Sequence, residues 1–185
     1  MSAAGLQSRI QQLAQILHHD YADTRILLVC TLKGAHPFFC HLGEALQSLR
    51  HGYDVEFVRA SSYEGTSTTG QVKISGLDEA TLADRHVVIV EDILDTGTTL
   101  AHLVPQLQKA GQPASIQVVT LLDKRINEEK LYQAKYVGFS IPNHFIIGYG
   151  LDYNELYRDV ADIFIISPAG IAFDASQLYK GNDKQ

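Results

Sequence analysis

The chain has 185 residues, of which 45% are hydrophobic and 19% charged, and its formal net charge is −6. This length is typical of one domain, and this composition is typical of a soluble protein with a buried core. The negative charge argues against non-specific nucleic-acid binding, which needs a basic face. No apolar run approaches the ~18 residues of a membrane span. Two cysteines are too few for a disulfide framework. We therefore expect a cytoplasmic protein with neither nucleic-acid nor membrane partners.

The chain alternates between helical patterns and continuous apolar runs. Leu6, Ile10, Leu13 and Leu17 recur at helical spacing and predict an amphipathic helix near the N-terminus. Two further helices are predicted near residues 38–49 and 98–110. Apolar runs predict strands at residues 26–31, 55–60, 87–91, 116–122, 136–139, 145–147 and 163–166, and a shorter one at 72–74.

Strand–helix alternation with continuous apolar strands predicts an α/β fold, in which helices flank a twisted parallel sheet. Ligands of such sheets bind at the carboxyl ends of the strands. Polar motifs follow three of the predicted strands, at Lys33, at residues 91–99 and at Lys124. We therefore expect these motifs to converge on one edge of the sheet.

The sequence VVIVEDILDTGTTL at residues 87–100 is the most informative stretch of the chain. A buried strand leads into two adjacent acids, a third acid, a loop of threonines and glycine, and then an apolar helix. The N-terminus of a helix offers unpaired N–H groups and a positive dipole end to a phosphate. Threonine hydroxyls add hydrogen-bond donors, and Gly97 allows close approach of the backbone. The order of these parts indicates a site for a phosphorylated sugar.

This stretch resembles the phosphoribosyl-diphosphate (PRPP) signature of type I phosphoribosyltransferases. Further matches narrow the resemblance to the hypoxanthine-guanine (6-oxopurine) branch, and they occur in the family's order over roughly residues 25–170. These matches are Leu32-Lys33-Gly34, Ser62-Tyr63, Leu121-Leu122-Asp123-Lys124, Phe145 to Gly150, Leu151-Asp152-Tyr153-Asn154 and Arg158-Asp159. The resemblance implies the type I phosphoribosyltransferase fold with a small hood made by the terminal segments.

The resemblance implies a Mg²⁺-dependent purine salvage enzyme that converts PRPP and hypoxanthine or guanine into IMP or GMP and pyrophosphate. Asp95 would be catalytic, accepting or returning the proton at purine N7. The 5-phosphate and ribose of PRPP would be bound by Glu91, Asp92, Asp95, Thr96, Gly97, Thr98 and Thr99. Position 98 is a threonine where some relatives carry a lysine, which we expect to affect phosphate affinity only modestly.

The remaining roles follow from the same resemblance. Pyrophosphate would be bound by the backbone N–H groups of Lys33 and Gly34 and by the side chain of Arg158, and in this family the peptide bond before that lysine can be cis. Carboxylates at Glu91, Asp92 and Asp152 would hold Mg²⁺, which prefers a few carboxylates together with substrate oxygens. The purine would be bound by Lys124, Phe145, Ile146 and Asp152. Lysine is only a donor, so Lys124 suits a 6-oxo group and not the 6-amino group of adenine.

The resemblance also implies how the single domain of residues 1–185 is organised. The core would span roughly residues 25–140, and the hood would comprise residues 1–20 and 142–180. The polar loop at residues 61–76, with Ser62 and Tyr63, would be a lid that excludes water. We expect a homodimer or homotetramer. A xanthine-preferring relative and a nucleotide-responsive regulator of the same fold stay open as alternatives.

Overall fold

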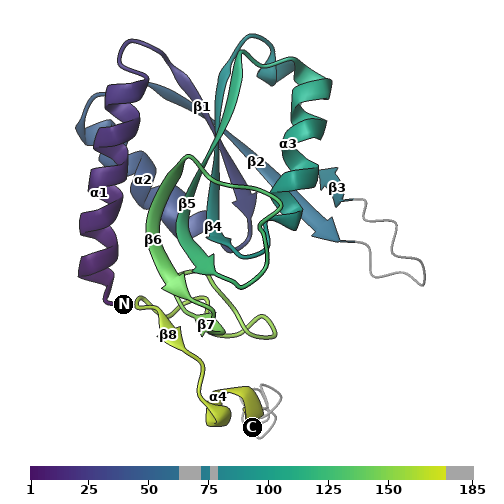
Figure 1. Ribbon diagram of the computed structural model, residues 1–185. Coiled ribbons are helices and arrows are strands. Elements are labelled where there is room, and N and C mark those ends of the chain that lie inside the picture. Colours follow the sequence, from purple (N-terminus) through teal and green to yellow (C-terminus); the bar gives the residue numbers. More distant parts are fainter. Residues whose placement is uncertain (63–71, 76–78, 174–185) are drawn as a thin grey trace, which may run out of the picture.

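A six-stranded sheet with the order β3-β2-β1-β4-β5-β6 forms the centre of the computed structural model, which describes residues 1–62, 72–75 and 79–173 (Figure 1). The pairs β2–β1, β1–β4, β4–β5 and β5–β6 are parallel, whereas β3 runs antiparallel to β2 at one edge. The strands are β1 (Ile26–Leu32), β2 (Tyr53–Ser62), β3 (Val72–Ser75), β4 (His86–Leu94), β5 (Ser115–Arg125) and β6 (Tyr136–Pro142).

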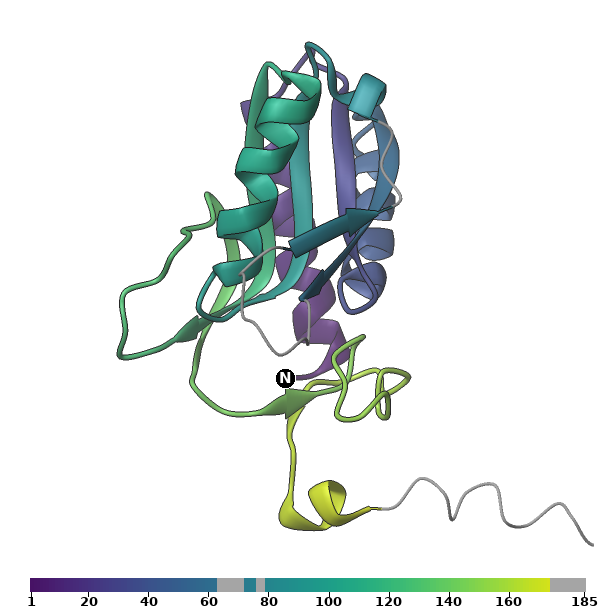
Figure 2. The same cartoon turned by 90° about the vertical axis from the view of Figure 1, so that its right-hand side faces the viewer.

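Helices cover both faces of this sheet. On one face, α1 (Ala3–Asp20) and α2 (His36–Ser48) share a buried cluster with strand residues such as Leu28 and Val88. On the other face, α3 (Thr98–Gly111) packs on the alternate residues of the same strands, such as Val29 and Ile89 (Figure 2). Successive side chains of a strand point to opposite faces, so strands that are apolar throughout are buried on both sides. The predicted α/β class with a helix-flanked parallel sheet is confirmed.

A small second sheet lies beside the carboxyl ends of the main strands. It pairs β7 (Ile146–Ile147) with β8 (Phe164–Ile165) in antiparallel register (Figure 1). The chain's N-terminus joins this region, because the Met1 ammonium donates to the Ile163 carbonyl oxygen at 2.6 Å and the Ile163 N–H donates back to Met1 at 2.9 Å. The division into a core and a hood from both termini stays a prediction.

The predicted strands and helices are present, and their bounds differ where long-range pairing extends them. The strand predicted at 87–91 continues to Leu94, because Ile93 and Leu94 pair with Leu122 and Asp123 of β5. Two short helices were not predicted, the 3₁₀ turn η1 (Glu79–Leu82) and α4 (Pro168–Ala172). Among the described residues, no helix is long and apolar enough to cross a membrane.

Candidate functional site

The carboxyl edge of the sheet carries the predicted polar motifs. Lys33 directly follows β1, Asp95 directly follows β4, and Lys124 lies near the end of β5. Between this edge and the β7 region lies a pocket of about 230 Å³. Its lining combines acids, one lysine and apolar side chains: Asp92, Ile93, Asp95, Lys124, Phe145, Ile146, Leu151 and Asp152.

A second, smaller pocket adjoins the first and shares Ile93 and Asp95 with it. Its volume is about 80 Å³, and its lining includes Glu91 and the whole predicted phosphate loop, residues 95–99. Gly97 has a φ of 80°, which suits glycine, and it is the N-cap of α3 without a capping side chain. The Thr98 N–H makes only a long contact, 3.4 Å to Thr96 Oγ1, so the first turn of α3 can offer N–H groups to an anion. The hydroxyl groups of Thr96 and Thr98 lie 2.8 Å apart at the same turn.

Asp95 stands where the two pockets meet, and it pairs with a lysine. The Lys124 ammonium donates to Asp95 Oδ2 at 2.9 Å. The Lys124 side chain is 11% exposed, whereas that of Asp95 is 49% exposed. The aspartate is thus accessible to a ligand, and a buried cation sits beside it.

The two acids near the end of β4, Glu91 and Asp92, are partly buried. Burial raises the pKa of Glu91 above its usual value, and the charge of Asp92 adds to that shift. Burial also raises the pKa of the Asp92 carboxyl group, although a hydrogen bond from the Ile93 N–H opposes the change. Within the described part of the chain, Glu91 Oε2 is buried without a hydrogen-bond partner. Such an atom leaves room for a donor or a cation from a ligand.

The loop after β1 packs closely against Asp92. The Leu32–Lys33 peptide bond is cis, as the family resemblance allowed. A Cβ atom on Gly34 would lie 1.8 Å from Asp92 Oδ2, so only glycine fits there without movement. The same loop contacts the segment after β7, because a Cβ atom on Gly150 would lie 2.2 Å from the Gly34 carbonyl oxygen.

Arg158 is fixed by carbonyl and carboxylate acceptors. Its Nη1 donates to the Gly150 carbonyl oxygen at 2.8 Å, and its Nη2 lies 2.8 Å from Asp152 Oδ1. The other oxygen of Asp152 accepts the Glu155 N–H at 2.8 Å. The arginine is therefore held next to the acidic end of the site.

Apolar residues close the large pocket on the side of the small sheet. Phe145 is 52% exposed, and its ring meets that of Tyr153 edge to face with 5.5 Å between centroids. Ile146 pairs with Ile165 in the sheet. The exposed face of Phe145 offers a stacking surface for a flat ring.

Sequence comparison connects this geometry with known proteins. Residues 3–154 match the phosphoribosyl transferase domain family. The hypoxanthine-guanine phosphoribosyltransferase of Mus musculus is 37% identical over 174 residues, which cover 90% of this chain and 79% of that protein. The enzyme of the same name from Homo sapiens is 36% identical with the same coverage. The chain belongs to the hypoxanthine-guanine branch of the phosphoribosyltransferase family.

Solved structures of phosphoribosyltransferases share this fold. Hypoxanthine phosphoribosyltransferase from Trypanosoma cruzi, in complex with the product IMP, is 35% identical, with a TM-score of 0.83 over 91% of this chain and 92% of that one. The Staphylococcus aureus hypoxanthine phosphoribosyltransferase is 36% identical, with a TM-score of 0.82 over 91% of this chain and 90% of that one. The type I phosphoribosyltransferase fold implied by the motifs is confirmed.

Of the predicted phosphoribosyltransferase site, Lys33, Gly34 and Arg158 are not among the residues that line these two pockets. Ser62 is the last residue of β2, and Tyr63 with most of the predicted lid lies outside the described residues, so the lid stays a prediction. Glu155, to which the sequence assigned no role, makes ion pairs with Lys33 and with Arg158. In the sequence, the only signal that Glu155 belongs near the site is its position three residues after Asp152.

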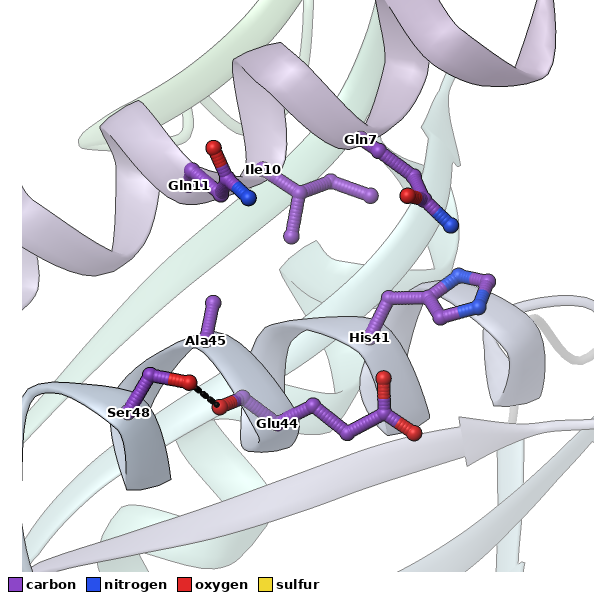
Figure 3. A pocket seen from close by; sticks show the side chains of 7 residues that line it. All are labelled: Gln7, Ile10, Gln11, His41, Glu44, Ala45 and Ser48. Carbon is purple, nitrogen blue, oxygen red and sulfur yellow. Dashed lines mark hydrogen bonds between the residues drawn. The ribbon is translucent and has the colours of Figure 1, made fainter.

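Another groove of this phosphoribosyltransferase lies between α1 and α2 and holds none of the predicted site residues (Figure 3). Its volume is about 160 Å³, and it is lined by Gln7, Ile10, Gln11, His41, Glu44, Ala45 and Ser48. The candidate functional site is therefore the pair of adjoining pockets at the carboxyl edge of the sheet.

Proposed function

We propose that this chain transfers the phosphoribosyl group of PRPP to N9 of hypoxanthine or guanine, giving IMP or GMP and pyrophosphate. The arrangement of the two pockets carries this proposal. The smaller pocket lies at a helix N-terminus and would hold the phosphate, and the larger one combines a lysine donor with an aromatic face. Asp95 lines both. A nucleoside monophosphate has the same three parts, with a sugar between its phosphate and its base.

The phosphate loop would bind the 5-phosphate through backbone N–H groups and through the hydroxyls of Thr96, Thr98 and Thr99. Glu91 and Asp92, at the end of β4, would accept hydrogen bonds from the ribose hydroxyls. Burial raises the pKa of both carboxyl groups, so additional hydrogen-bond donors would stabilise their charged forms. Sugar hydroxyls would supply such donors.

The larger pocket would bind the purine. Lys124 would donate to the 6-oxo group, Phe145 would stack on the ring, and the backbone at Ile146 would contact the edge around N1 and C2. Asp95 would take the purine N7 proton as the new glycosidic bond forms. Lys124 Nζ lies 2.9 Å from Asp95 Oδ2, so one ammonium group can contact both the 6-oxo group and the carboxylate beside N7.

Pyrophosphate would leave toward Lys33, Gly34 and Arg158. Guanidinium and ammonium groups stabilise the charge that develops on such a leaving group. The acidic residues Glu91, Asp92 and Asp152 fit a hard cation, because Glu91 Oε2 is buried without a partner among the described residues. No three His, Cys, Asp or Glu side chains gather as a ligand set in the described ranges, so these three acids do not form one metal cluster. Mg²⁺ would therefore be held by one or two of them together with substrate oxygens, and it would neutralise the diphosphate.

A spectrophotometric assay with PRPP and Mg²⁺ tests the proposal. Hypoxanthine, guanine, xanthine and adenine are supplied separately, and we expect turnover with hypoxanthine or guanine, none with adenine, and none after EDTA treatment. Higher kcat/KM for xanthine would make the chain a xanthine-preferring relative. Absence of turnover with all four bases, in folded protein that still binds PRPP, would favour a nucleotide-responsive regulator instead.

Replacing Lys124 by methionine is expected to lower kcat/KM for hypoxanthine by about 10- to 100-fold. The change keeps the aliphatic length and removes the donor, and a hydrogen bond that involves a charged group contributes about 1.5–3 kcal/mol. Steady-state kinetics with each base measures the effect. The exposed Lys109 in the last turn of α3 provides the matched control, and Lys109→Met should behave like wild type. An unchanged kcat/KM in Lys124→Met would place the 6-oxo group elsewhere.

A homodimer or homotetramer is also part of the proposal. Exposed apolar side chains support it, because Phe164 and Ile165 of β8 are 51% and 62% exposed. A Trypanosoma cruzi relative has been studied for the role of its C-terminal region in oligomeric state and activity. Light scattering after gel filtration distinguishes the two assemblies.

A further inference from the structure

A carboxylate already bridges the two cations assigned to pyrophosphate. Glu155 Oε2 lies 2.7 Å from the Lys33 ammonium, and Glu155 Oε1 lies 3.1 Å from Arg158 Nη2. Each oxygen of the one carboxylate therefore contacts one cation. Two oxygens of a diphosphate would make contacts of the same kind with the same nitrogens.

The bridge joins distant parts of the chain. Lys33 belongs to the loop after β1, and Glu155 follows it by 122 residues. The Glu155 side chain is 64% exposed and that of Lys33 is 54% exposed, so the ion pair is exposed to solvent. Exposed ion pairs are weak and are screened by salt. A multiply charged anion could therefore displace this carboxylate at little cost.

The two cations depend on Glu155 to different degrees. Arg158 also contacts the Gly150 carbonyl oxygen and Asp152 Oδ1, each at 2.8 Å, and neither contact involves the Glu155 side chain. Among the described residues, Glu155 is the only ion-pair partner of Lys33. Removal of the Glu155 charge should thus free the lysine without releasing the arginine.

We propose that Glu155 is an internal competitor of pyrophosphate, holding Lys33 and Arg158 in place in the empty enzyme and withdrawing when the diphosphate of PRPP binds. The inference rests on the proposed function, which assigns these two cations to that group. Its consequence is weaker binding of both PRPP and pyrophosphate than the two cations alone would give. Weaker binding of the product favours its release after transfer.

Glu155→Gln removes the charge and keeps the shape. We expect the KM for PRPP and the Kd of magnesium pyrophosphate both to fall by about two- to fivefold. This range corresponds to the free energy that one exposed ion pair contributes. The KM for hypoxanthine should not change. Raising the salt concentration should shrink the difference between variant and wild type, since exposed charges are screened. A purely structural role for Glu155 would not produce this salt dependence.

Glu44→Gln is the matched control, because Glu44 is an exposed acid on α2, in the groove of Figure 3. It carries the same change of charge and should leave both constants as in wild type. An unchanged or raised Kd of pyrophosphate in Glu155→Gln, with the melting temperature preserved, would overturn the inference.

The failure of this inference is distinguishable from failure of the proposed function. Calorimetric titration with magnesium pyrophosphate needs no purine and no turnover, so it measures the effect of Glu155 directly. Absence of turnover with every 6-oxopurine would contradict the function alone. Normal turnover with no tighter binding of pyrophosphate in Glu155→Gln would contradict the inference alone.

Discussion

Replacing Asp95 by asparagine is expected to lower kcat for hypoxanthine by about 10²- to 10⁴-fold, the usual contribution of a general acid–base group. Asparagine has nearly the same shape but cannot take a proton from purine N7. Asp95 directly follows β4 and lines both pockets. The buried ammonium group of Lys124 lies 2.9 Å from its Oδ2. Stopped-flow or steady-state kinetics measures kcat, and calorimetry with PRPP shows whether the phosphate site stays intact.

A control substitution at a second aspartate distinguishes the loss of a catalytic group from the loss of a negative charge. Asp23 is exposed in the turn after α1, at the opposite end of β1 from the site. Asp23→Asn should therefore retain wild-type kinetics. If Asp95→Asn kept more than about a third of wild-type kcat, which is far above the range for a lost general base, the N7 proton would have to go to another group.

Gly34→Ala is expected to lower kcat/KM for PRPP by about 10²-fold, because it moves a group of the site by roughly an ångström. The added Cβ would lie 1.8 Å from Asp92 Oδ2 and 2.8 Å from its Cγ. Asp92 cannot turn away freely, since its Oδ1 accepts the Ile93 N–H at 2.9 Å. Either the acid at the ribose or the loop at the pyrophosphate must shift. Overpacking of this kind also costs about 1–3 kcal/mol of folding free energy.

Thermal melting and PRPP kinetics of the same protein measure the two effects of Gly34→Ala separately. Gly5→Ala is the control, because a Cβ atom there meets only Ser2 Oγ at 3.4 Å, an ordinary contact. Gly5 lies in the first turn of α1, so alanine should raise stability slightly and leave kinetics unchanged. Wild-type kcat/KM in Gly34→Ala would show that the contact with Asp92 does not matter for PRPP.

Much of the fold could be predicted from local sequence patterns. The apolar run beginning at Ile26 is buried on both sides of the sheet, and the spacing of Leu6, Ile10, Leu13 and Leu17 gives the buried face of α1. Burial of apolar side chains is the dominant favourable contribution to folding. The spacing of the buried apolar residues along the sequence differs between helices and strands. These elements therefore leave a signal in the sequence itself.

The grouping of the candidate site could also be predicted in outline. Lys33, Asp95 and Lys124 each follow or end a predicted strand, and parallel strands bring their carboxyl ends to one edge. The structure places all three at that edge. The phosphate loop was identifiable because strand, acids, hydroxyl–glycine loop and helix occur in continuous sequence.

Only the tertiary structure decided which of these groups touch. The sequence by itself determined the α/β class, the position of the phosphate loop and the set of polar residues at the sheet edge. It did not determine the extension of β4 to Leu94, the pairing of Lys124 with Asp95, or the bridge from Glu155 to Lys33. The physical reason is that these contacts join residues far apart in the sequence. Glu155 and Lys33, for example, are 122 residues apart. They meet only because of the strand order of the sheet and the position of the β7–β8 region, which no local sequence pattern specifies.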